Sequence, residues 1–573
     1  MRTWLIPLLT GLALLCCDVD RRKTPHQIEL SERRRSRRLL MAARDGGAAK
    51  PPLPETPRAR KVVIAIDAEP HHLNPLLKIS PWGFRIAMYN VYEPLVRRDP
   101  KTNEPRPHLA TEWTVSPDGR VYKFTLRRDV TWHDGQPFTA RDVWYTIRRI
   151  HDRLTPMGPF RVDLMNEFHQ VDTLGPHAVR ITLVRANSYL LDHLCDVPIL
   201  PYHATGRSIP RGHRINSRPL GTGPFRFLKW VRSKEIRLLR NERYWGGVPD
   251  VQEVVFRLLP DPSKALTDLK RGLVDILPSV ARQHYPDQIT LWARRRFQQL
   301  WSEPPGFNFI LWNTQHRILS DFRVRRALTM LIDRPRIIKE VYRGLVRPLA
   351  GPFYSAAGLG DPKLEPWPYD PVRARNLLDN AGWRDRDGDK IRDLDEQAMR
   401  IVLLRPVTST VMDDELKVIV AEFKRSGVEL EPVQTDWRRL SRLLHTRKFM
   451  AAALSYRSRP AEDLSELFHS AGTRNYGRTG SLMIDKLLGR MRVALSRRKR
   501  AEYSAKLDRA LHAAQPLTFV HGPRILTLVH RRLQNVQIGS EWIRLDRLRV
   551  VKFQDPARSS GRQLSGWGAK KGQ

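Results

Sequence analysis

The chain has 573 residues, more than one hydrophobic core usually serves, so two or three domains are expected. Hydrophobic residues make up 41% of the sequence and include 15 Trp, a composition that excludes a largely disordered protein. The formal net charge of +40 would suit a nucleic-acid binder, but the chain has no zinc-finger, helix-turn-helix or aromatic-basic sheet motif, so no nucleic-acid partner is expected.

The amino terminus is predicted to be a lipoprotein-type signal peptide covering residues 1–17. Trp4 to Leu15 is an apolar run that is too short for the ~20 residues of a membrane-spanning helix. Cys16 and Cys17 follow at once, and a Cys directly after such a run is where bacterial lipoproteins carry their lipid. Cys17 is the expected lipidated residue, with Cys16 as the small residue before it. The alternative is a cleaved signal with two incidental cysteines.

A basic, flexible tether is predicted for residues 18–60, where Arg-rich runs alternate with Gly and Pro. Asp18 to Lys61 holds 13 Lys and Arg against 6 Asp and Glu, so most of the positive charge belongs to the folded body. A tether of this sign beside a lipid anchor is expected to be attracted to anionic lipids. Residues 554–573 form a small, polar and basic tail that is expected to be disordered.

The folded body is predicted to begin with a buried strand. Val62 to Ile66 is apolar without interruption, as in strands covered on both faces. The loop Glu69 to Pro75 follows and contains His71 and His72. This pair could bind a metal ion or haem, but in a chain with 18 His a solvated pair is favoured, so no metal is expected.

The next segment is predicted to form a turn, two short strands and a capped helix. Ser116 to Gly119 has the residues of a tight turn. Apolar residues near period two then mark one strand from Val121 to Leu126 and another from Val130 to Trp132. Thr139 is expected to cap a helix with one apolar face. The residues on that face are Val143, Ile147 and Ile150.

No enzyme activity and no cofactor are expected. The chain lacks the Gly-x-Ser-x-Gly, His-Glu-x-x-His and Gly-x-x-x-x-Gly-Lys-Ser/Thr motifs. Cys195 is the one cysteine of the mature body, so it cannot form an internal disulfide. It follows the apolar stretch from Tyr189, which favours a buried structural thiol over a catalytic Cys–His pair.

An acidic loop at residues 385–396 resembles a cation site. Alternating carboxylates supply the oxygen ligands that calcium prefers, but Gly388 comes one residue too early for an EF-hand. A plain β-hairpin connection is therefore favoured, and calcium binding is left as the alternative.

Several sequence blocks, in the right order, resemble the extracytoplasmic solute-binding proteins that deliver dipeptides and oligopeptides to ABC importers. The second block contains LGTGPF and RNERYWGG, which resemble the family's Gly-Thr-Gly-Pro strand and Tyr-Trp-Gly-Gly turn. The resemblance extends from Lys61 to Phe553. The blocks are Leu109–Ile150, Leu220–Gly247, Leu269–Ile276, Asn313–Gly344 and Tyr369–Trp383.

This resemblance implies an α/β, two-lobed, periplasmic-binding-protein-like fold with mixed sheets and three structural domains around a ligand cleft. Residues 61–94, 202–299 and 525–553 would form a discontinuous lobe I domain. Residues 95–201 would be a smaller inserted domain, and residues 300–524 would form lobe II.

The segment that resembles the family's ligand anchor departs from the pattern. Peptide-binding relatives carry Trp-x-Ala-Asp-Tyr-x-x-Pro, whose Asp pairs with the peptide's α-ammonium group. Aligning the family's Pro with Pro460 places Tyr456 at the Asp position, with Arg457 beside it. An ammonium group buried next to Arg without a carboxylate would be costly. Glu462 or Asp463 would supply the carboxylate if the alignment shifts.

Tyr456, Arg457 and Trp82 are the predicted ligand-binding residues, and core packing is the alternative for Trp82. An anionic or neutral ligand group facing Tyr456 and Arg457 is expected. The resemblance implies the substrate-binding component of an importer, outside the cytoplasm, with a peptide or peptide-like solute and ABC permease and ATPase subunits as partners. The alternative function is a receptor or surface module that is not coupled to import and acts in sensing, adhesion or as a chaperone.

Overall fold

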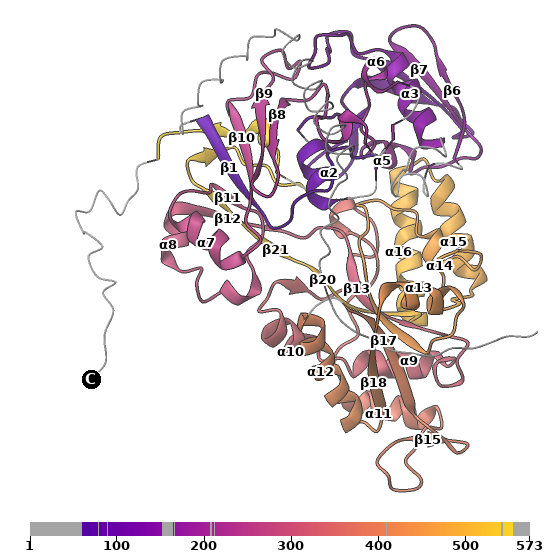
Figure 1. Cartoon of the computed structure of the whole chain (residues 1–573). Helices are drawn as coiled ribbons and strands as arrows, with labels where there is room; N and C mark the ends of the chain where they lie inside the picture. The colour runs from indigo at the N-terminus through magenta and orange to yellow at the C-terminus, as the bar shows by residue number, and fades with distance from the viewer. Residues whose placement is uncertain are drawn as a thin grey trace, which may run out of the picture. The chain divides into compact units, whose positions relative to one another are not determined.

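The computed structural model describes residues 60–77, 80–88, 90–151, 164, 167–206, 209–210, 212–407, 410–539 and 543–553 (Figure 1). The predicted signal peptide with Cys17, the carboxy-terminal tail and all but the last residue of the predicted tether lie outside these ranges. Within them, no helix combines the length and the apolar character needed to cross a bilayer.

A seven-stranded mixed sheet contains segments from both ends of the described chain. Its strand order is β12-β21-β11-β1-β10-β9-β8, and β1 is parallel to both of its neighbours, β10 and β11. Five of the six residues of β1 are buried, which confirms the predicted buried strand at Val62 to Ile66. The strands are β1 (Lys61–Ile66), β8 (Phe225–Val231), β9 (Glu235–Arg240), β10 (Glu253–Leu258), β11 (Ile276–Leu277), β12 (Phe297–Ser302) and β21 (Ile525–His530).

Short helices and turns accompany this sheet. The helix α2 (Pro81–Met88) follows the loop after β1, and Figure 1 shows it beside the sheet. The others are η2 (Arg214–Asn216), α7 (Pro262–Lys270), η3 (Arg282–His284), α8 (Leu291–Arg296), η7 (Leu545–Arg547) and the strand pair β22 (Leu533–Gln534) and β23 (Arg549–Val550). The short helix α6 (Tyr202–Thr205) lies instead against the helix of residues 140–151.

A separate four-stranded antiparallel sheet, ordered β4-β5-β7-β6, carries the helix predicted from the sequence after Thr139. The predicted helical face is confirmed, because its three apolar side chains are all buried. The predicted second strand at Val130 to Trp132 is wrong, since only an isolated bridge from Thr131 to Pro137 forms there. The elements are β2 (Val96–Arg98), β3 (Pro105–Pro107), β4 (Ala110–Val115), β5 (Val121–Leu126), α3 (Ala140–His151), β6 (Phe168–Thr173), β7 (Ala178–Leu183) and α5 (Leu190–Leu194).

A six-stranded sheet, ordered β14-β20-β13-β19-β17-β18, organises the rest of the chain. Its strands are β13 (Phe307–Trp312), β14 (Val346–Arg347), β17 (Arg400–Pro406), β18 (Glu429–Thr435), β19 (Ala451–Tyr456) and β20 (Leu517–Pro523). Its helices are η4 (Arg317–Leu319), α9 (Phe322–Met330), α10 (Arg334–Arg336), η5 (Ile337–Val341), η6 (Ser355–Ala357), α11 (Pro371–Asn380), α12 (Thr410–Arg425), α13 (Trp437–His445), α14 (Ser465–Phe468), α15 (Leu482–Val493) and α16 (Arg497–Ala514), and a hairpin pairs β15 (Asp393–Leu394) with β16 (Gln397–Ala398).

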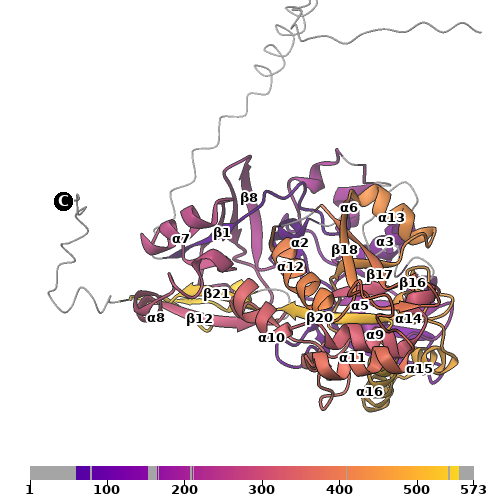
Figure 2. The ribbon, with the colours of Figure 1, turned by 90° about the horizontal axis from the view of Figure 1, so that it is seen from below.

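Two short connections join the seven-stranded and six-stranded sheets. Residues 303–306 lead from β12 to β13, and Arg524 alone separates β20 from β21. In Figure 2, β20 and β21 follow one another almost end to end. The guanidinium of Arg524 lies 4.4 Å from the ring centroid of Trp301 near the end of β12, and its Nε lies 4.0 Å from Oε1 of Glu303, which links the two connections. Few backbone bonds therefore need to rotate for one sheet to move against the other.

The buried carboxylate of Glu93 connects the segment that precedes the four-stranded sheet to residues that flank β8 and β9 of the seven-stranded sheet. The side chain of Glu93 accepts hydrogen bonds from Thr222 Oγ1 at 2.8 Å, Tyr244 Oη at 2.8 Å and Trp245 Nε1 at 3.1 Å. His108 Nε2 lies 2.8 Å from the same carboxylate. The Gly-Thr-Gly and Tyr-Trp-Gly-Gly blocks of the sequence therefore meet at one acceptor.

Two glycines allow the backbone to approach this carboxylate closely. A Cβ at Gly221 would lie 1.8 Å from the carbonyl oxygen of Val91, and one at Gly223 would lie 2.6 Å from that of Asn90. Both distances are far below a van der Waals contact, so a side chain at either position would push the two segments apart. Glycine at both positions is therefore a packing requirement.

The network also controls the ionisation of Glu93. Burial acts to raise its pKa, but the ion pair with His108 and the hydrogen bonds from Trp245 and Thr222 outweigh burial and lower the pKa from 4.5 to about 2. Because the folded-state pKa is the lower one, the ionised group stabilises the fold above about pH 4.5. This contribution is lost as the pH falls toward 2.

We expect Glu93→Gln to lower the free energy of unfolding at pH 7 by about 3 kcal/mol, because buried donors lose a charged acceptor. The variant should also show a weaker dependence of stability on pH between about 5 and 2. Urea unfolding measures both effects. Glu242→Gln is the control, since that side chain is 62% exposed. Equal stability of the two variants would contradict the role given to Glu93.

Candidate ligand-binding site

A cavity of about 520 Å³ lies between the seven-stranded sheet and the residue that follows β19. One wall is formed by the carboxyl end of β1, the start of α2 and the loop before α7. The opposite side includes Arg457 and the connection between β12 and β13. The cavity therefore borders one of the two links between the sheets, where a relative movement of the sheets would change its width.

Trp82 and Arg457, two of the three predicted ligand-binding residues, line this cavity together. Trp82 is only 7% exposed, and its Nε1 donates a 2.5 Å hydrogen bond to Oδ1 of Asp67. The guanidinium of Arg85 lies 5.2 Å from the centroid of the indole ring. Trp82 thus packs as a buried side chain and also contributes to the wall.

Tyr456, the third predicted residue, is not among the residues that line the cavity. It is the last residue of β19, and its hydroxyl donates a 2.7 Å hydrogen bond to Oε1 of Glu462. Its ring lies 5.3 Å, centroid to centroid, from that of Phe307. The other oxygen of Glu462 accepts the backbone N–H of Arg459 at 3.0 Å. The nearby carboxylate that could replace the family's Asp is therefore already engaged within its own loop.

Asp463, the other proposed substitute, belongs to an ion-pair group between the four-stranded sheet region and the helices of the six-stranded sheet. Arg492 on α15 pairs with Asp463 and also with Glu167, at 2.5 Å from the latter. Both carboxylates and the guanidinium are largely shielded from solvent. Further pairs at the same boundary are Arg98–Asp192, Arg98–Asp196, Arg459–Asp196 and Arg500–Asp192.

Sequence reasoning missed Asp67 and Arg85, the remaining charged side chains that line the cavity. A signal for Asp67 was present, because it directly follows the buried strand β1. Ligands of open α/β sheets bind outside the carboxyl ends of the parallel strands, and Asp67 stands at that position. No such signal marked Arg85, which faces the cavity because of the direction in which α2 runs.

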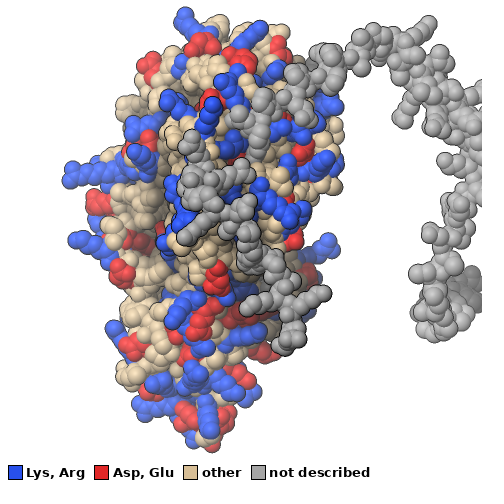
Figure 3. Space-filling model, turned by 90° about the vertical axis from the view of Figure 1, so that its left-hand side faces the viewer, with Lys and Arg blue, Asp and Glu red and all other residues tan. Residues whose placement is uncertain are grey.

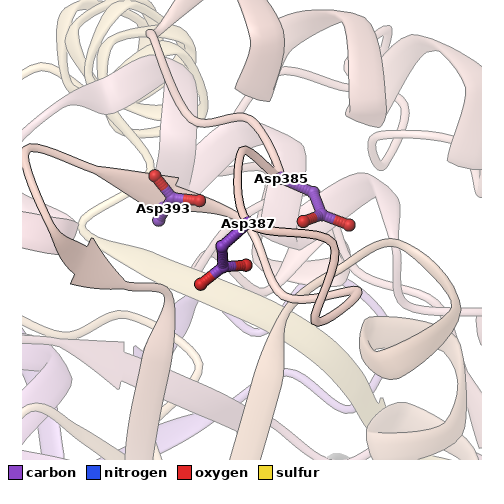
Figure 4. A group of neighbouring side chains, drawn as sticks. All are labelled: Asp385, Asp387 and Asp393. Carbon is purple, nitrogen blue, oxygen red and sulfur yellow. The ribbon is translucent and has the colours of Figure 1, made fainter.

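The acidic loop has three carboxylates close together. One oxygen each of Asp385, Asp387 and Asp393 lies within 4.8 Å of the others, and Figure 4 shows the three side chains grouped beside the loop. Asp385 accepts the N–H of Gly388 at 2.8 Å, and Asp393 accepts the N–H of Arg386 at 3.0 Å. These turn hydrogen bonds hold the carboxylates in place, as expected of a loop that leads into a hairpin.

The remaining sequence candidates take structural positions. Cys195 is 3% exposed, and burial raises the pKa of its thiol, which confirms the predicted buried thiol. In the described part of the chain, His71 and His72 do not belong to any group of three potential metal ligands.

Comparisons with known proteins agree on one family. Residues 104–477 match the family model described as bacterial extracellular solute-binding proteins, family 5 Middle. A Brucella ovis protein named for ABC-transporter peptide binding is 30% identical over 369 residues, which cover 64% of this chain and 66%, just under two thirds, of that relative. The dipeptide-binding protein of Escherichia coli is 28% identical over 412 residues, covering 66% of this chain and 72% of that protein.

The fold also resembles solved structures. The oligopeptide-binding protein AppA from Bacillus subtilis, solved in complex with a nonapeptide, superposes with a TM-score of 0.69. The superposition covers 86% of this chain and 99% of AppA, at 22% sequence identity. The α/β fold expected from the sequence, with several mixed sheets and a ligand cleft, is thereby confirmed.

We expect Arg492→Gln to lower the free energy of unfolding by about 3 kcal/mol, because it leaves two shielded carboxylates without their partner. The matched control is Arg490→Gln, on the exposed side of the same helix, which should change stability by less than about 0.5 kcal/mol. Chemical denaturation of both variants gives the comparison. A loss that is no larger for Arg492→Gln would show that these ion pairs add nothing to the fold.

Proposed function

Because the chain belongs to the bacterial extracellular solute-binding proteins of family 5, we propose that it is the substrate-binding component of an ABC-type importer. In this role it captures a peptide or peptide-like solute and presents it to a membrane permease coupled to an ATPase. The observation that carries the proposal is the cavity of about 520 Å³ beside the two-stranded connection between the sheets, with Trp82 on one side and Arg457 on the other.

Binding is a closure of two lobes over the solute. The seven-stranded and four-stranded sheets belong to one lobe and the six-stranded sheet to the other, with residues 303–306 and Arg524 as the hinge. A ligand that contacts both walls stabilises the closed arrangement by the free energy of the contacts that only this arrangement provides. Arg457 supplies such a contact, because it reaches the cavity from the lobe opposite Trp82.

The charges in the cavity favour a carboxylate of the ligand over its amino group. The two cationic side chains in the lining are Arg85 and Arg457, and the single carboxylate, Asp67, already accepts the indole N–H of Trp82. Glu462 is engaged by Tyr456 and by backbone, so an ammonium group has no ready partner there. A peptide would therefore bind with its carboxyl terminus, or an acidic side chain, at Arg457.

The protein acts outside the cytoplasm, held at the membrane by a lipid on Cys17 and by the basic tether of residues 18–60. The support is the apolar run from Trp4 to Leu15, which Cys16 and Cys17 directly follow, and the excess of Lys and Arg in the tether. Such a tether leaves the binding lobes free to reach the permease while restricting them to the membrane surface, which raises their effective concentration there.

Tripeptides in four forms test which terminus of a peptide the site recognises. The forms are unmodified, amino-terminally acetylated, carboxyl-terminally amidated, and blocked at both ends. Amidation should weaken binding about tenfold or more, since it removes a charge-assisted hydrogen bond, whereas acetylation should change it by less than about threefold. In Arg457→Gln the effect of amidation should disappear, and in the control Arg438→Gln, an exposed residue of the same lobe, it should persist. Calorimetry measures each affinity. Strong dependence on the free amino group would instead assign the anchor to a carboxylate.

The lipid anchor on Cys17 is tested with the Cys17→Ser variant, expressed in a host that attaches lipids to such proteins. The variant should appear in the soluble fraction after cell lysis at high salt, while the unaltered protein stays with the membranes. High salt is needed because it shortens the Debye length to roughly 3 Å at 1 M and so removes the attraction of the tether. Cys16→Ser is the matched control and should remain membrane-bound. Equal fractionation of both variants would exclude a lipid at Cys17.

A further inference from the structure

A second concave region, a groove of about 1000 Å³, runs along β8 at the edge of the seven-stranded sheet. Among the described strands, β8 pairs only with β9, so its outer edge has no strand partner. The opposite wall consists of η2 and the residues that follow it up to Leu220. None of the residues that line the groove also lines the cavity of the proposed solute site.

The groove concentrates positive charge. Its five cationic residues are Arg214, Arg218, Arg226, Lys229 and Arg232, and all of them are exposed. The lining contains one carboxylate, Asp134, which lies 2.7 Å from Nε2 of His203. Arg232 lies 3.9 Å from Glu69, but the other four cations form no ion pair with a carboxylate of the described residues.

The charge of the five Arg and Lys residues in the groove is permanent. Burial lowers the pKa of His133 to about 4, so this residue at the end of the groove is neutral. Arginine and lysine keep their charge at every physiological pH. A concave surface lined by like charges focuses the electrostatic potential, so an acidic ligand is attracted there more strongly than to a flat surface. In Figure 3, Lys and Arg are spread widely over the face that is drawn, with Asp and Glu scattered between them.

The groove also offers apolar surface between the charges. Phe227, Leu228 and Trp230 on β8 are each partly exposed, and Leu220 on the opposite wall is as well. The guanidinium of Arg232 lies 3.5 Å from the ring centroid of Trp230, which holds this cation against the apolar floor. Along β8 and the residue that follows it, the cations at positions 226, 229 and 232 are thus separated by pairs of apolar residues.

We propose that this groove binds an extended acidic peptide segment of a partner protein, in which Asp or Glu residues alternate with apolar ones. Such a segment matches the cations with carboxylates and covers the apolar floor, and it can run parallel to the open edge of β8. A bilayer surface is flat and would not reach into the groove. A phosphate chain would pair with the cations but leave the apolar floor in water.

Side chains, more than backbone hydrogen bonds, are expected to provide the affinity. The pairing of β8 with β9 shifts register between Phe227 and Lys229, and such a bulge interrupts the regular edge that an added strand would need. Both the charges and the apolar side chains of the groove are therefore expected to contribute to binding.

The probe is an eight-residue peptide of alternating Glu and Val, blocked at both ends and fluorescently labelled, with binding followed by anisotropy. The double variant Arg226→Gln/Lys229→Gln should weaken binding at least about tenfold, and binding should fall as salt rises. The control Arg498→Gln/Lys499→Gln removes the same charge from an exposed stretch of α16 and should have little effect. Arg457→Gln, which alters the solute cavity, should also leave binding of this probe unchanged.

A third variant, Leu228→Ser, separates a peptide from other polyanions. It should weaken binding of the Glu-Val peptide about threefold or more while leaving the binding of sodium tripolyphosphate unchanged. Thermal unfolding confirms that each variant is folded. If the two double variants, in the groove and on α16, bind the Glu-Val peptide with equal affinity, the groove is not its binding site. Binding of tripolyphosphate or phosphatidylglycerol vesicles at least as strong as that of the peptide, with no effect of Leu228→Ser, would overturn the acidic peptide as the occupant.

Discussion

The hydrogen-bond network around Glu93 is the constraint on which the geometry of the cavity depends. A buried carboxylate is tolerated only if donors surround it, and Thr222, Tyr244, Trp245 and His108 all come within hydrogen-bonding distance. These donors come from segments far apart in the sequence. Satisfying one carboxylate therefore fixes the chain that leaves α2 against the seven-stranded sheet, and with it the helix that carries Trp82 and Arg85 to the cavity.

The abundance of arginine has different consequences inside the fold and at its surface. At the boundary that contains Arg492, cations and carboxylates are paired away from solvent, so each is held in place and each would be costly to leave alone. Other cations line concave surfaces: Arg85 and Arg457 line the cavity, and five Arg and Lys residues line the groove along β8. The net charge of +40 is the excess of 100 Lys and Arg over 60 Asp and Glu, so ion pairs such as those of Arg492 contribute nothing to it.

Local patterns in the sequence were sufficient for elements whose burial follows a simple period. The strand at Val62 to Ile66, the helical face that ends at Ile150 and the buried thiol of Cys195 were all predictable. The strand predicted at Val130 to Trp132 failed because the chain turns at once, with Gly135 N–H bonded to the carbonyl of Trp132 at 2.8 Å. The apolar residues there are buried without a strand partner, and periodicity alone does not separate these two cases.

The candidate site was predictable only where a residue's neighbours along the chain carried the information. Arg457 was named from the segment that aligns with the family's ligand anchor, and Trp82 because it follows the loop Glu69 to Pro75, and both line the cavity. The hydrogen bond from Tyr456 to Glu462 depends on the path of the loop between them, which the local sequence pattern does not reveal. The pairing of Arg492 with Glu167 joins residues more than 300 positions apart, so it depends on tertiary packing that no local pattern reports.

In the proposed function, one small solute binds between the lobes and is held by Arg457. Native mass spectrometry of the protein purified from its own host can detect this solute. We expect one bound molecule per chain, with the fragmentation pattern of a peptide-like compound that has a free carboxylate, and its loss from the Arg457→Gln variant. A protein that carries no such molecule, or one that is retained fully by Arg457→Gln, would contradict the account.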